Sequence, residues 1–396
     1  MKALVLAGGE PKNLKTLVPP GRSKHTLRIL GKPVIAYPIE ALSKTLKRDI
    51  VLVYSNFDVV EEAKQYAKDR IIPVEQEKPG IEGAILSAEQ YLRDTEHFLL
   101  MYGDLIIDQK AILTLLEKFY EEEPLAAILT IPLEERFAST YGVAVVNIEG
   151  CIEHVLEKPK IEEVRKLTAY TLGGVYILPT WAYDLIEKYR SLSNALNELI
   201  KKGKVVSVHW SGLWIDIGYP SDLIAASTQL LQKLDKTVIE DKAVIENNVV
   251  IKPPVYIDEG AYIDHYAVLK GPLYVGKNSF IGAHSFVRDC SDIEQNVRIG
   301  AYSEVKHSII QPYTLIDSFA YIADSIIGEN TSIGSHIVTL NVLPQDEIPP
   351  RLREYLVTPS EKRKEWKLGA IIGYNVKISA GRVLNPGQII PPNTVY

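Results

Sequence analysis

Residues 275–300, with the sequence VGKNSFIGAHSFVRDCSDIEQNVRIG, carry an aliphatic residue at every sixth position. The same spacing extends on both sides of this stretch, from Ile239 to Val305. Six residues turn an α-helix by about 600°, so this spacing does not mark one helical face. Six is, however, a multiple of the strand period of two. The pattern therefore predicts a solenoid of short strands and turns, in which each coil buries the face of the next.

The repeat continues towards the C-terminus with two interruptions. The first lies near Gln311, and the second covers residues 340–370, which lack the spacing and contain four prolines. We expect the second interruption to be a loop or arm that projects from the coil. Outside the interruptions, the in-register positions that we assign are Ile309, Leu315, Tyr321, Ile327, Ile333, Ile372, Ile378, Leu384 and Ile390.

Residues 1–232 follow a different pattern, in which strand-like and helix-like segments alternate. Strands are predicted over 2–7, 50–54 and 98–101, and helices over 33–43, 59–67 and 109–122. This alternation is typical of βαβ units in a mostly parallel sheet with helices on both faces. Ligands of such sheets bind at the carboxyl ends of the strands, where Gly8-Gly9 and Gly103-Asp104 fall. We therefore expect two domains, 1–232 and 238–396.

Composition excludes several classes of protein. The formal net charge is −6, so no overall basic field attracts nucleic acid. No apolar run approaches the roughly 20 residues of a membrane-spanning helix. The two cysteines, Cys151 and Cys290, lie far apart and form no metal-binding pair, which favours a reduced, cytoplasmic protein.

Five stretches of the first domain resemble the sugar-phosphate nucleotidylyltransferases, and the coil resembles left-handed parallel β-helix proteins. The stretches are LAGG at 6–9, RSKHTLRILGKPVIAYPIEAL at 22–42, YGD at 102–104, EKP at 157–159 and WIDIGYPSDLIAA at 214–226. Together the two halves are similar to bifunctional archaeal nucleotidylyltransferase/acetyltransferases. The fold that this resemblance implies is an α/β Rossmann-like nucleotidyltransferase domain followed by an all-β left-handed parallel β-helix.

The resemblance implies attack by a sugar-1-phosphate on the α-phosphorus of a nucleoside triphosphate, with release of pyrophosphate. Such a reaction requires two polyanions to be held in line and their charge to be neutralised. Mg²⁺ held by one or two carboxylates suits this task. The residues matched to the family are Asp104 and Asp216 for the metal, Lys24 for the triphosphate, Gly8 and Gly9 for phosphate at a helix N-terminus, Gly142 and Glu157 for the sugar, and Lys158 for the sugar phosphate.

Several positions depart from the family pattern. Pro11 replaces a loop glycine, and Asn13 replaces the arginine that normally stabilises the transferring phosphates. Leu172 stands where an asparagine usually meets the sugar, and the family's Gly-Thr-Ala is residues 80–82, Gly-Ile-Glu. Glu75 falls at the position of the base-reading glutamine, but the register is open by one residue and Gln76 is adjacent. These changes indicate either relaxed constraint or a changed substrate.

The coil contains residues of a second candidate site. Lys306 and Asn341 match substrate-contacting positions of amino-sugar acetyltransferases that use acetyl-CoA. The expected general-base histidine aligns with Ser318, so this site has no evident base unless His307 or His336 replaces it.

Three hypotheses follow from the sequence. The leading one is a sugar-1-phosphate nucleotidylyltransferase that uses Mg²⁺. The second is a catalytically impaired regulatory paralogue that binds a nucleotide or nucleotide-sugar and assembles with an active relative. The third is a scaffold whose coil forms an oligomer. A homo-oligomer is expected in each case, with a trimer favoured by the resemblance. The base and the sugar are not assigned.

Overall fold

The computed structural model describes residues 1–134, 138–343 and 366–396, which form two compact units. Residues 1–10 and 34–216 form the first, here called the α/β unit. Residues 11–33 and 217–396 form the second, here called the coil unit. The segment Pro11–Pro33 therefore packs with the coil, although it follows the glycine loop directly in the chain.

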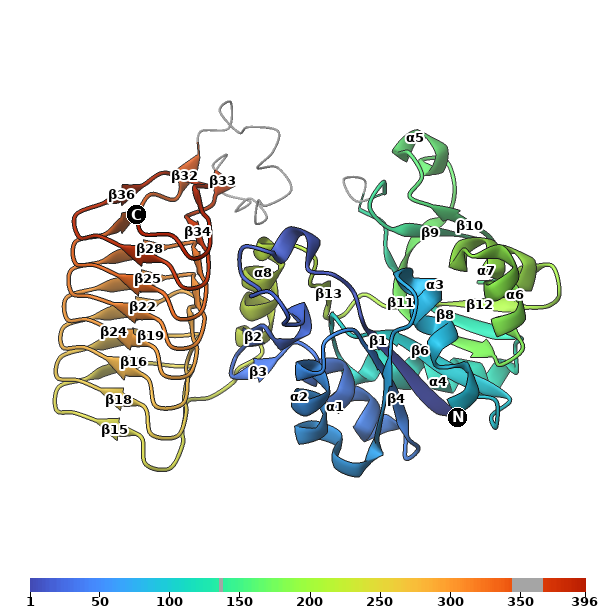
Figure 1. Ribbon diagram of the computed structural model, residues 1–396, viewed down its shortest axis with the longest axis horizontal. Coiled ribbons are helices and arrows are strands. Elements are labelled where there is room, and N and C mark those ends of the chain that lie inside the picture. Colours follow the sequence, from blue (N-terminus) through green and yellow to red (C-terminus); the bar gives the residue numbers. More distant parts are fainter. Residues whose placement is uncertain (135–137, 344–365) are drawn as a thin grey trace. The chain divides into compact units, whose positions relative to one another are not determined.

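The α/β unit is built on a sheet with the strand order β10-β9-β11-β6-β1-β4-β5, and β8 joins β11 to β12 (Figure 1). Its strands are β1 (Lys2–Ala7), β4 (Ile50–Tyr54), β5 (Ile71–Glu75), β6 (His97–Tyr102), β7 (Leu105–Ile107), β8 (Ala126–Pro132), β9 (Gly142–Val146), β10 (Ile152–Glu157), β11 (Ala169–Pro179), β12 (Val205–His209) and β13 (Trp214–Asp216). Its α-helices are α1 (Ala36–Thr45), α2 (Asp58–Ala67), α3 (Gly80–Ser87), α4 (Gln109–Glu122), α5 (Ile161–Val164), α6 (Ala182–Tyr189) and α7 (Leu192–Ile200), and its 3₁₀ turns are η3 (Lys68–Arg70) and η4 (Glu89–Tyr91).

The sheet is mixed, whereas the sequence predicts a mostly parallel one. Strands β6, β1, β4 and β5 are parallel, but β11 runs antiparallel to β6, β8 and β9. One further antiparallel pair has a local cause: β9 and β10 are joined by a tight turn in which Gly150 N donates to Asn147 O at 3.1 Å. A tight turn can join only antiparallel strands, because parallel strands need a long crossover.

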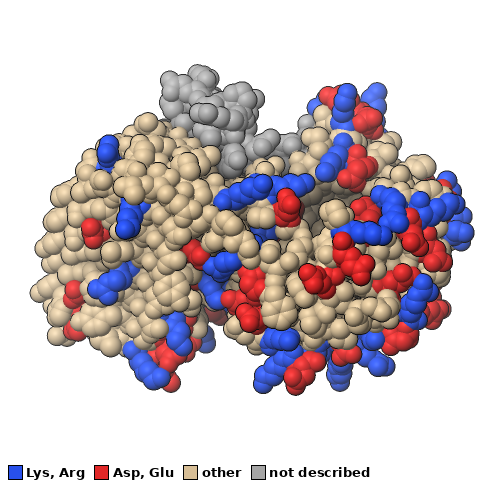
Figure 2. Space-filling view, viewed as in Figure 1, with Lys and Arg blue, Asp and Glu red and all other residues tan. Residues whose placement is uncertain are grey.

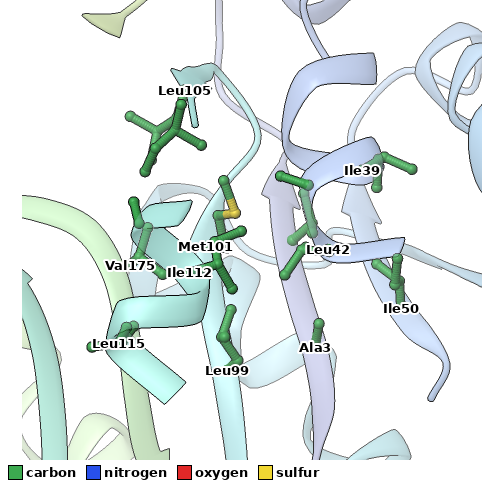
Figure 3. Close-up of a cluster of buried hydrophobic side chains, with 14 of the residues drawn as sticks. Ala3, Ile39, Leu42, Ile50, Leu99, Met101, Leu105, Ile112, Leu115 and Val175 are labelled. Carbon is green, nitrogen blue, oxygen red and sulfur yellow. The ribbon is translucent and has the colours of Figure 1, made fainter. Parts of the chain in front are cut away.

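Side chains of the central strands alternate between two buried layers. Ala3, Val5 and Ala7 of β1 pack with α1, α2 and α4, and Figure 3 shows part of this cluster around Met101 and Ile112. Leu4 and Leu6 point to the opposite layer, which contains residues of α3, α6 and α7. This alternation confirms the expectation of helices on both faces.

The coil unit winds short strands into three parallel sheets. The first contains β14 (Val238–Ile239), β17 (Val255–Ile257), β20 (Leu273–Val275), β23 (Asp292–Ile293), β26 (Ile309–Ile310), β29 (Ile326–Ile327), β34 (Ile371–Ile372) and β37 (Ile389–Ile390). The second contains β15 (Val244–Ile245), β18 (Tyr262–Ile263), β21 (Phe280–Ile281), β24 (Arg298–Ile299), β27 (Leu315–Ile316), β30 (Ser332–Ile333) and β35 (Lys377–Ile378). The third contains β16 (Val250–Lys252), β19 (Val268–Lys270), β22 (Phe286–Arg288), β25 (Glu304–Lys306), β28 (Tyr321–Ala323), β31 (Val338–Thr339) and β36 (Val383–Leu384). The predicted solenoid, of the left-handed β-helix class, is confirmed.

The phase of the repeat differs from our assignment in one region. The inward residues there are Ile310, Ile316 and Ile322, all fully buried, rather than Ile309, Leu315 and Tyr321. Glu304 of β25 pairs with Tyr321 of β28, a separation of 17 residues, whereas Phe286 pairs with Glu304 at 18. One coil is therefore a residue short, and this moves every later inward position by one until the next short coil.

The outer face of the first sheet is also buried. Asp292, Ile309, Ile326 and Ile371 point outwards from this sheet and are at most 1% exposed. On this side, helix α8 (Pro220–Leu231) packs against β26 and against the hairpin of β2 (Arg28–Ile29) and β3 (Lys32–Pro33), and Leu30 of the hairpin turn contacts Asp292. Segment Pro11–Pro33 also contains the 3₁₀ turns η1 (Lys12–Leu14) and η2 (Lys24–Thr26).

The second predicted interruption lies largely outside the described residues, since 344–365 are not described. Its two ends, β32 (Val342–Leu343) and β33 (Trp366–Lys367), pair antiparallel. The coil resumes directly afterwards, because β29 pairs with β34.

Acidic and basic side chains are interspersed on the face seen in Figure 2, as the modest net charge suggests. Among the described residues, none of the helices combines the length and the apolar composition needed to cross a bilayer.

The coil core gives a direct test of the sixfold pattern. Replacing the fully buried Ile299 by alanine should lower the free energy of unfolding by about 2–5 kcal/mol, because a cavity forms in the stacked column. Leu315→Ala is the matched control, since Leu315 pairs beside it but is 39% exposed. The Leu315→Ala substitution should lower the free energy of unfolding by less than about 1 kcal/mol. Urea unfolding followed by circular dichroism measures both, and equal costs would contradict the phase described here.

Candidate functional site

The carboxyl ends of β1, β4, β5 and β6 meet at one edge of the α/β unit. Gly8 follows β1, Ser55 follows β4, Gln76 follows β5, and Asp104 lies two residues after β6. Ser55 Oγ donates to Gly8 O at 2.6 Å. A parallel sheet places its ligands at this edge, and the polar groups of the sequence accumulate there.

The side chain of Gln76 lies against Gly8. A Cβ atom at Gly8 would come within 1.8 Å of Gln76 Oε1, so a glycine at this position allows the close approach. Gln76 Nε2 donates to Lys78 O and Gly80 O at 2.6 and 3.0 Å. Glu75 instead is exposed at the last position of β5. The structure thus places Gln76, and not Glu75, beside the glycine loop.

The loop after Gly9 differs from the expectation of a helix N-terminus. Pro11 is followed by η1, a single 3₁₀ turn of three residues, and not by an α-helix. Proline has no N–H group and cannot donate to an anion there. Around Gly9 the space is open, since an added Cβ would meet no atom within 4 Å.

The two predicted metal ligands lie side by side. Strands β7 and β13 pair antiparallel, with Asp216 opposite Leu105, the residue that follows Asp104. The side-chain indole of Trp214 donates to Gly173 O at 2.8 Å, which ties β13 to β11. Within the described residues no group of three or more His, Cys, Asp or Glu side chains has the arrangement of a metal site. Two adjacent carboxylates nevertheless suit Mg²⁺, which takes its other ligands from phosphates and water.

The residues matched to the sugar also converge. Gly142 of β9 pairs with Glu157 of β10, and a Cβ at Gly142 would lie 2.8 Å from Leu172 Cδ1 and 3.6 Å from Glu157 Oε2. Ser193 Oγ donates to Glu157 Oε2 at 2.6 Å. Lys158 follows β10 as an exposed residue with φ of 47°. Leu172, 9% exposed, therefore presents an apolar surface beside Gly142 and Glu157.

Two buried tyrosines lie near Asp104 and Glu157, the residues matched to the metal and to the sugar. Burial and the neighbouring Tyr176 raise the pKa of Tyr102 well above its usual value, and the carboxylates of Asp104 and Glu157 add to this effect. Burial raises the pKa of Tyr176 to about 12. Both hydroxyls therefore stay protonated at neutral pH, and the two side chains hydrogen-bond to each other.

One departure from the family pattern has a structural explanation. Glu82 Oε1 accepts a hydrogen bond from Leu192 N at 2.8 Å, the first residue of α7. Glu82 thus caps a helix that carries Ser193, and it stabilises the sugar side of the site indirectly.

Lys24 belongs to the coil unit. It begins η2, and its Nζ donates to Ile217 O at 3.1 Å. The N-cap Ser23 contacts His25 Nδ1 at 2.8 Å, and Thr26 Oγ1 donates to Ser23 O at 2.9 Å. This local network fixes the turn from which Lys24 projects.

The structure gathers the coil candidates around Asp324, which is 2% exposed. His307 Nδ1 lies 2.6 Å from Asp324 Oδ1, and Asn341 Nδ2 donates to Asp324 Oδ2. Burial opposes ionisation of Asp324, but the contacts with His307, Asn341 and Lys306 outweigh it and lower its pKa. Burial lowers the pKa of Lys306. Within the described part of the chain, the side chains of Ser318 and His336 make no hydrogen bond to this cluster.

Sequence reasoning missed Asp324, Ser193 and Ser55, and left Gln76 as an alternative. A signal was available for Gln76, because residues 71–74 before it are mostly apolar, although no strand was predicted there. Asp324 carries no motif of its own. It meets His307, 17 residues earlier in the chain, because β25 pairs with β28 on successive turns of the coil.

Comparison with known proteins agrees with both units. The family model described as nucleotidyl transferase matches residues 2–233, and the model described as GMPPB C-terminal domain matches residues 269–396. The Bifunctional protein GlmU of Methanocaldococcus jannaschii is 34% identical over 403 aligned residues, 99% of this chain and 92% of the relative. The Bifunctional sugar-1-phosphate nucleotidylyltransferase/acetyltransferase of Sulfurisphaera tokodaii is 28% identical, over 98% and 93% of the two chains.

A solved structure of UDP-glucose pyrophosphorylase complexed with UDP-glucose resembles the chain in fold, with a TM-score of 0.51 and 20% identity, over 59% of this chain and 98% of that one. The match of the nucleotidyl transferase model covers more than half of the chain, and the relative of M. jannaschii extends the likeness over nearly all of it. The chain therefore belongs to the sugar-1-phosphate nucleotidylyltransferase family.

Proposed function

We propose that the chain transfers a nucleotidyl group to a sugar-1-phosphate with Asp104 and Asp216 as the ligands of Mg²⁺. Members of the family generally use a divalent metal. The observation that carries this proposal is the β7–β13 pairing, which sets the two aspartates next to each other. Two aspartates at neighbouring positions can together hold one Mg²⁺, whose remaining ligands come from phosphates and water.

Each candidate side chain then has a role in the reaction. A bound Mg²⁺ would supply positive charge for the phosphates. Lys24 contacts the triphosphate, and Lys158 contacts the sugar phosphate, so that two anions can approach each other. Glu157 accepts hydrogen bonds from sugar hydroxyls with the oxygens that Ser193 leaves available. Gly8 and Gly9 keep the loop open for the triphosphate.

The same arrangement supports roles for Gln76 and Leu172 in substrate choice. Gln76 is held at the edge of the sheet because its amide nitrogen donates to two backbone carbonyls. Its amide oxygen is left as the atom that can accept a hydrogen bond from a base. Leu172 offers no hydrogen bond where an amide is usual. We propose that the sugar carries an apolar or unsubstituted position on that side.

We also propose that the protein acts in the cytoplasm as a homo-oligomer, with a trimer favoured. In this proposal residues 1–232 and 238–396 are the two functional modules. If the chain is instead a catalytically impaired paralogue, we expect it to assemble with an active relative.

The metal ligands are tested by conservative amide substitution in the full chain. Asp104→Asn should lower pyrophosphate release at least about a hundredfold, because the amide holds Mg²⁺ poorly, and Asp216→Asn should act similarly. Asp108→Asn is the matched control, since Asp108 caps α4 through Lys110 N and the amide can do the same. The screen covers all common triphosphates and sugar-1-phosphates. Turnover of the Asp104 variant at the unaltered rate would contradict the proposal, and binding without turnover by the unaltered chain would identify the impaired alternative.

Discrimination between nucleotide bases tests whether Gln76, and not Glu75, contacts the base. Gln76→Ala should reduce discrimination between triphosphates by about tenfold or more, because a site that hydrogen-bonds a substrate rejects analogues strongly. Glu75→Ala should leave discrimination unchanged, since Glu75 is exposed. Competition kinetics with pairs of triphosphates measures both, and the opposite ranking would contradict the assignment.

A second candidate function, acetylation of an amino sugar with acetyl-CoA, is supported by the cluster around Asp324. In this reaction the amine attacks the thioester carbonyl, the thiolate leaves and becomes a thiol, and a base takes the amine proton. Asp324 orients His307 as a carboxylate orients the histidine of a hydrolytic triad. Lys306 and Asn341 are then substrate contacts. The other ring nitrogen, Nε2, lies 3.1 Å from Thr228 Oγ1, so this hydroxyl must move aside or pass the proton on.

The coil site is tested with acetyl-CoA and a panel of amino-sugar phosphates. His307→Asn should abolish release of the free thiol, whereas Thr228→Ala should keep or increase it because the substitution exposes Nε2. Thiol detection measures both. A His307 variant as active as the unaltered chain would contradict the role of His307, and a loss of activity in both variants would assign the contact to folding of α8 onto the coil.

A further inference from the structure

The segment Pro11–Pro33 is attached to successive turns of the coil by a row of hydrogen bonds. Tyr374 N donates to Thr16 O at 3.2 Å. Arg22 Nη1 donates to both carboxylate oxygens of Glu329, at 2.7 and 2.8 Å. As the segment proceeds, its partners descend the coil turn by turn.

The next contact in the row is reciprocal. Arg28 N donates to Gln311 Oε1 at 3.1 Å, and Gln311 Nε2 donates to Arg28 O at 2.8 Å. Gln311 is 2% exposed, so water does not compete for these bonds. Gln311 occupies the place at which the sixfold spacing of the sequence fails.

The row ends at two buried carboxylates. Leu30 N donates to Asp292 Oδ2 at 3.0 Å, and Gly31 N donates to Glu294 Oε1 at 2.9 Å. Both acids are fully buried. The turn places Leu30 and Gly31 at φ values of 50° and 77°, so their N–H groups point towards the coil rather than into a strand ladder.

The second oxygen of each acid is not matched to a donor. Asp292 Oδ1 and Glu294 Oε2 are buried without a partner of hydrogen-bond geometry among the described residues. Burial raises the pKa of both groups, the proximity of Asp292 raises that of Glu294 further, and contacts with Ser227 and Arg28 only partly oppose this. Tyr274 of the coil also faces the pair, and its hydroxyl donates to Asp258 Oδ2 at 2.7 Å. The two carboxyls contact each other, so one proton shared between them supplies a donor to the pair.

Stability alone does not account for this arrangement. Neighbouring positions on the same outer face are the isoleucines 309, 326 and 371, which pack the surface without polar groups. Burying two carboxyls costs several kcal/mol unless they are fully hydrogen-bonded. The acids do, however, hold the backbone of residues 30 and 31 in one place, as apolar side chains cannot.

We propose that Asp292, Glu294, Gln311 and Glu329 of the coil are positioning residues for nucleotidyl transfer, because they fix the segment that carries Lys24. In the chain, Lys24 lies between Arg22 and Arg28, two residues that these coil side chains bind. Without these contacts Lys24 would keep its charge but lose its fixed position. Ordering the lysine on binding would then cost free energy and weaken the affinity for the triphosphate. The inference rests on the triphosphate contact proposed for Lys24.

The test compares variants of the full-length chain by kinetics and by calorimetric binding of the triphosphate. Glu294→Ala and Gln311→Ala should each raise the KM and the Kd for the triphosphate about tenfold, as expected for the loss of one or two hydrogen bonds. The KM for the sugar-1-phosphate should change less than about twofold. Gln311→Ala leaves no charge buried and guards against a Glu294 variant that fails to fold.

Glu294→Gln provides the rescue. Its amide keeps an acceptor for Gly31 N and offers an N–H to Asp292 Oδ1 in place of the shared proton, so the KM should stay near that of the unaltered chain. Because both pKa values are raised, the folded state favours the protonated pair, and the unaltered chain should lose triphosphate affinity as the pH rises into the alkaline range. The Gln variant should lose less. Glu246→Gln is the matched control, since Glu246 accepts from Tyr262 Oη at 2.6 Å on a different sheet of the coil.

Each outcome decides a separate point. Unchanged KM and Kd for the triphosphate in folded Glu294→Ala and Gln311→Ala would overturn the positioning role, and so would an equal rise in both KM values. If the unaltered chain binds a triphosphate without turnover, the proposed transfer fails, but a weaker Kd in the variants still supports positioning. If it binds no triphosphate, both proposals fail.

Discussion

Backbone pairing of β1 with β6 and of β7 with β13 is the constraint on which the chemistry of the α/β unit depends. The first pair brings the loop of Gly8 and the turn of Asp104 to the same edge, and Gly103 N donates to Leu6 O at 2.9 Å. The second pair sets Asp216 beside that turn. Hydrogen bonds between strands therefore bring the backbone of Asp104 and Asp216 to neighbouring positions.

The periodicity of the sequence predicts the elements of this unit better than their directions. Helix 109–122 agrees with α4 because Asp108 caps its start and Glu123, at φ of 45°, ends it. The direction of β11 depends instead on which strands it meets, and no local pattern encodes that choice. The pair Asp104 and Asp216 was proposed from family motifs. Ser193 carries no motif and joins the candidate site by its hydrogen bond to Glu157, from a helix whose first N–H is bound by the distant Glu82.

In the coil, the sixfold spacing predicts the architecture but not its phase. Ile309-Ile310 and Ile326-Ile327 are pairs of adjacent isoleucines, and both members of each pair are buried. One member faces the interior of the coil and the other lies on the buried outer face of the first sheet. The pattern of apolar residues therefore cannot distinguish them. The cluster around Asp324 arises in the same region, because the short coil after Val305 changes which residues meet across β25 and β28.

The altered glycine loop can now be considered together with the segment that follows it. Arg22 forms an ion pair with Glu329. It therefore does not take the place of the family arginine that Asn13 replaces. Lys12 and Lys15 are exposed and form no ion pair with any described residue, which leaves their charge available to a triphosphate. A lysine supplies charge but not the planar, two-pronged geometry of a guanidinium. Affinity depends mainly on charge, and stabilisation of the transferring phosphoryl group depends also on that geometry. The loop changes should consequently spare nucleotide binding more than turnover.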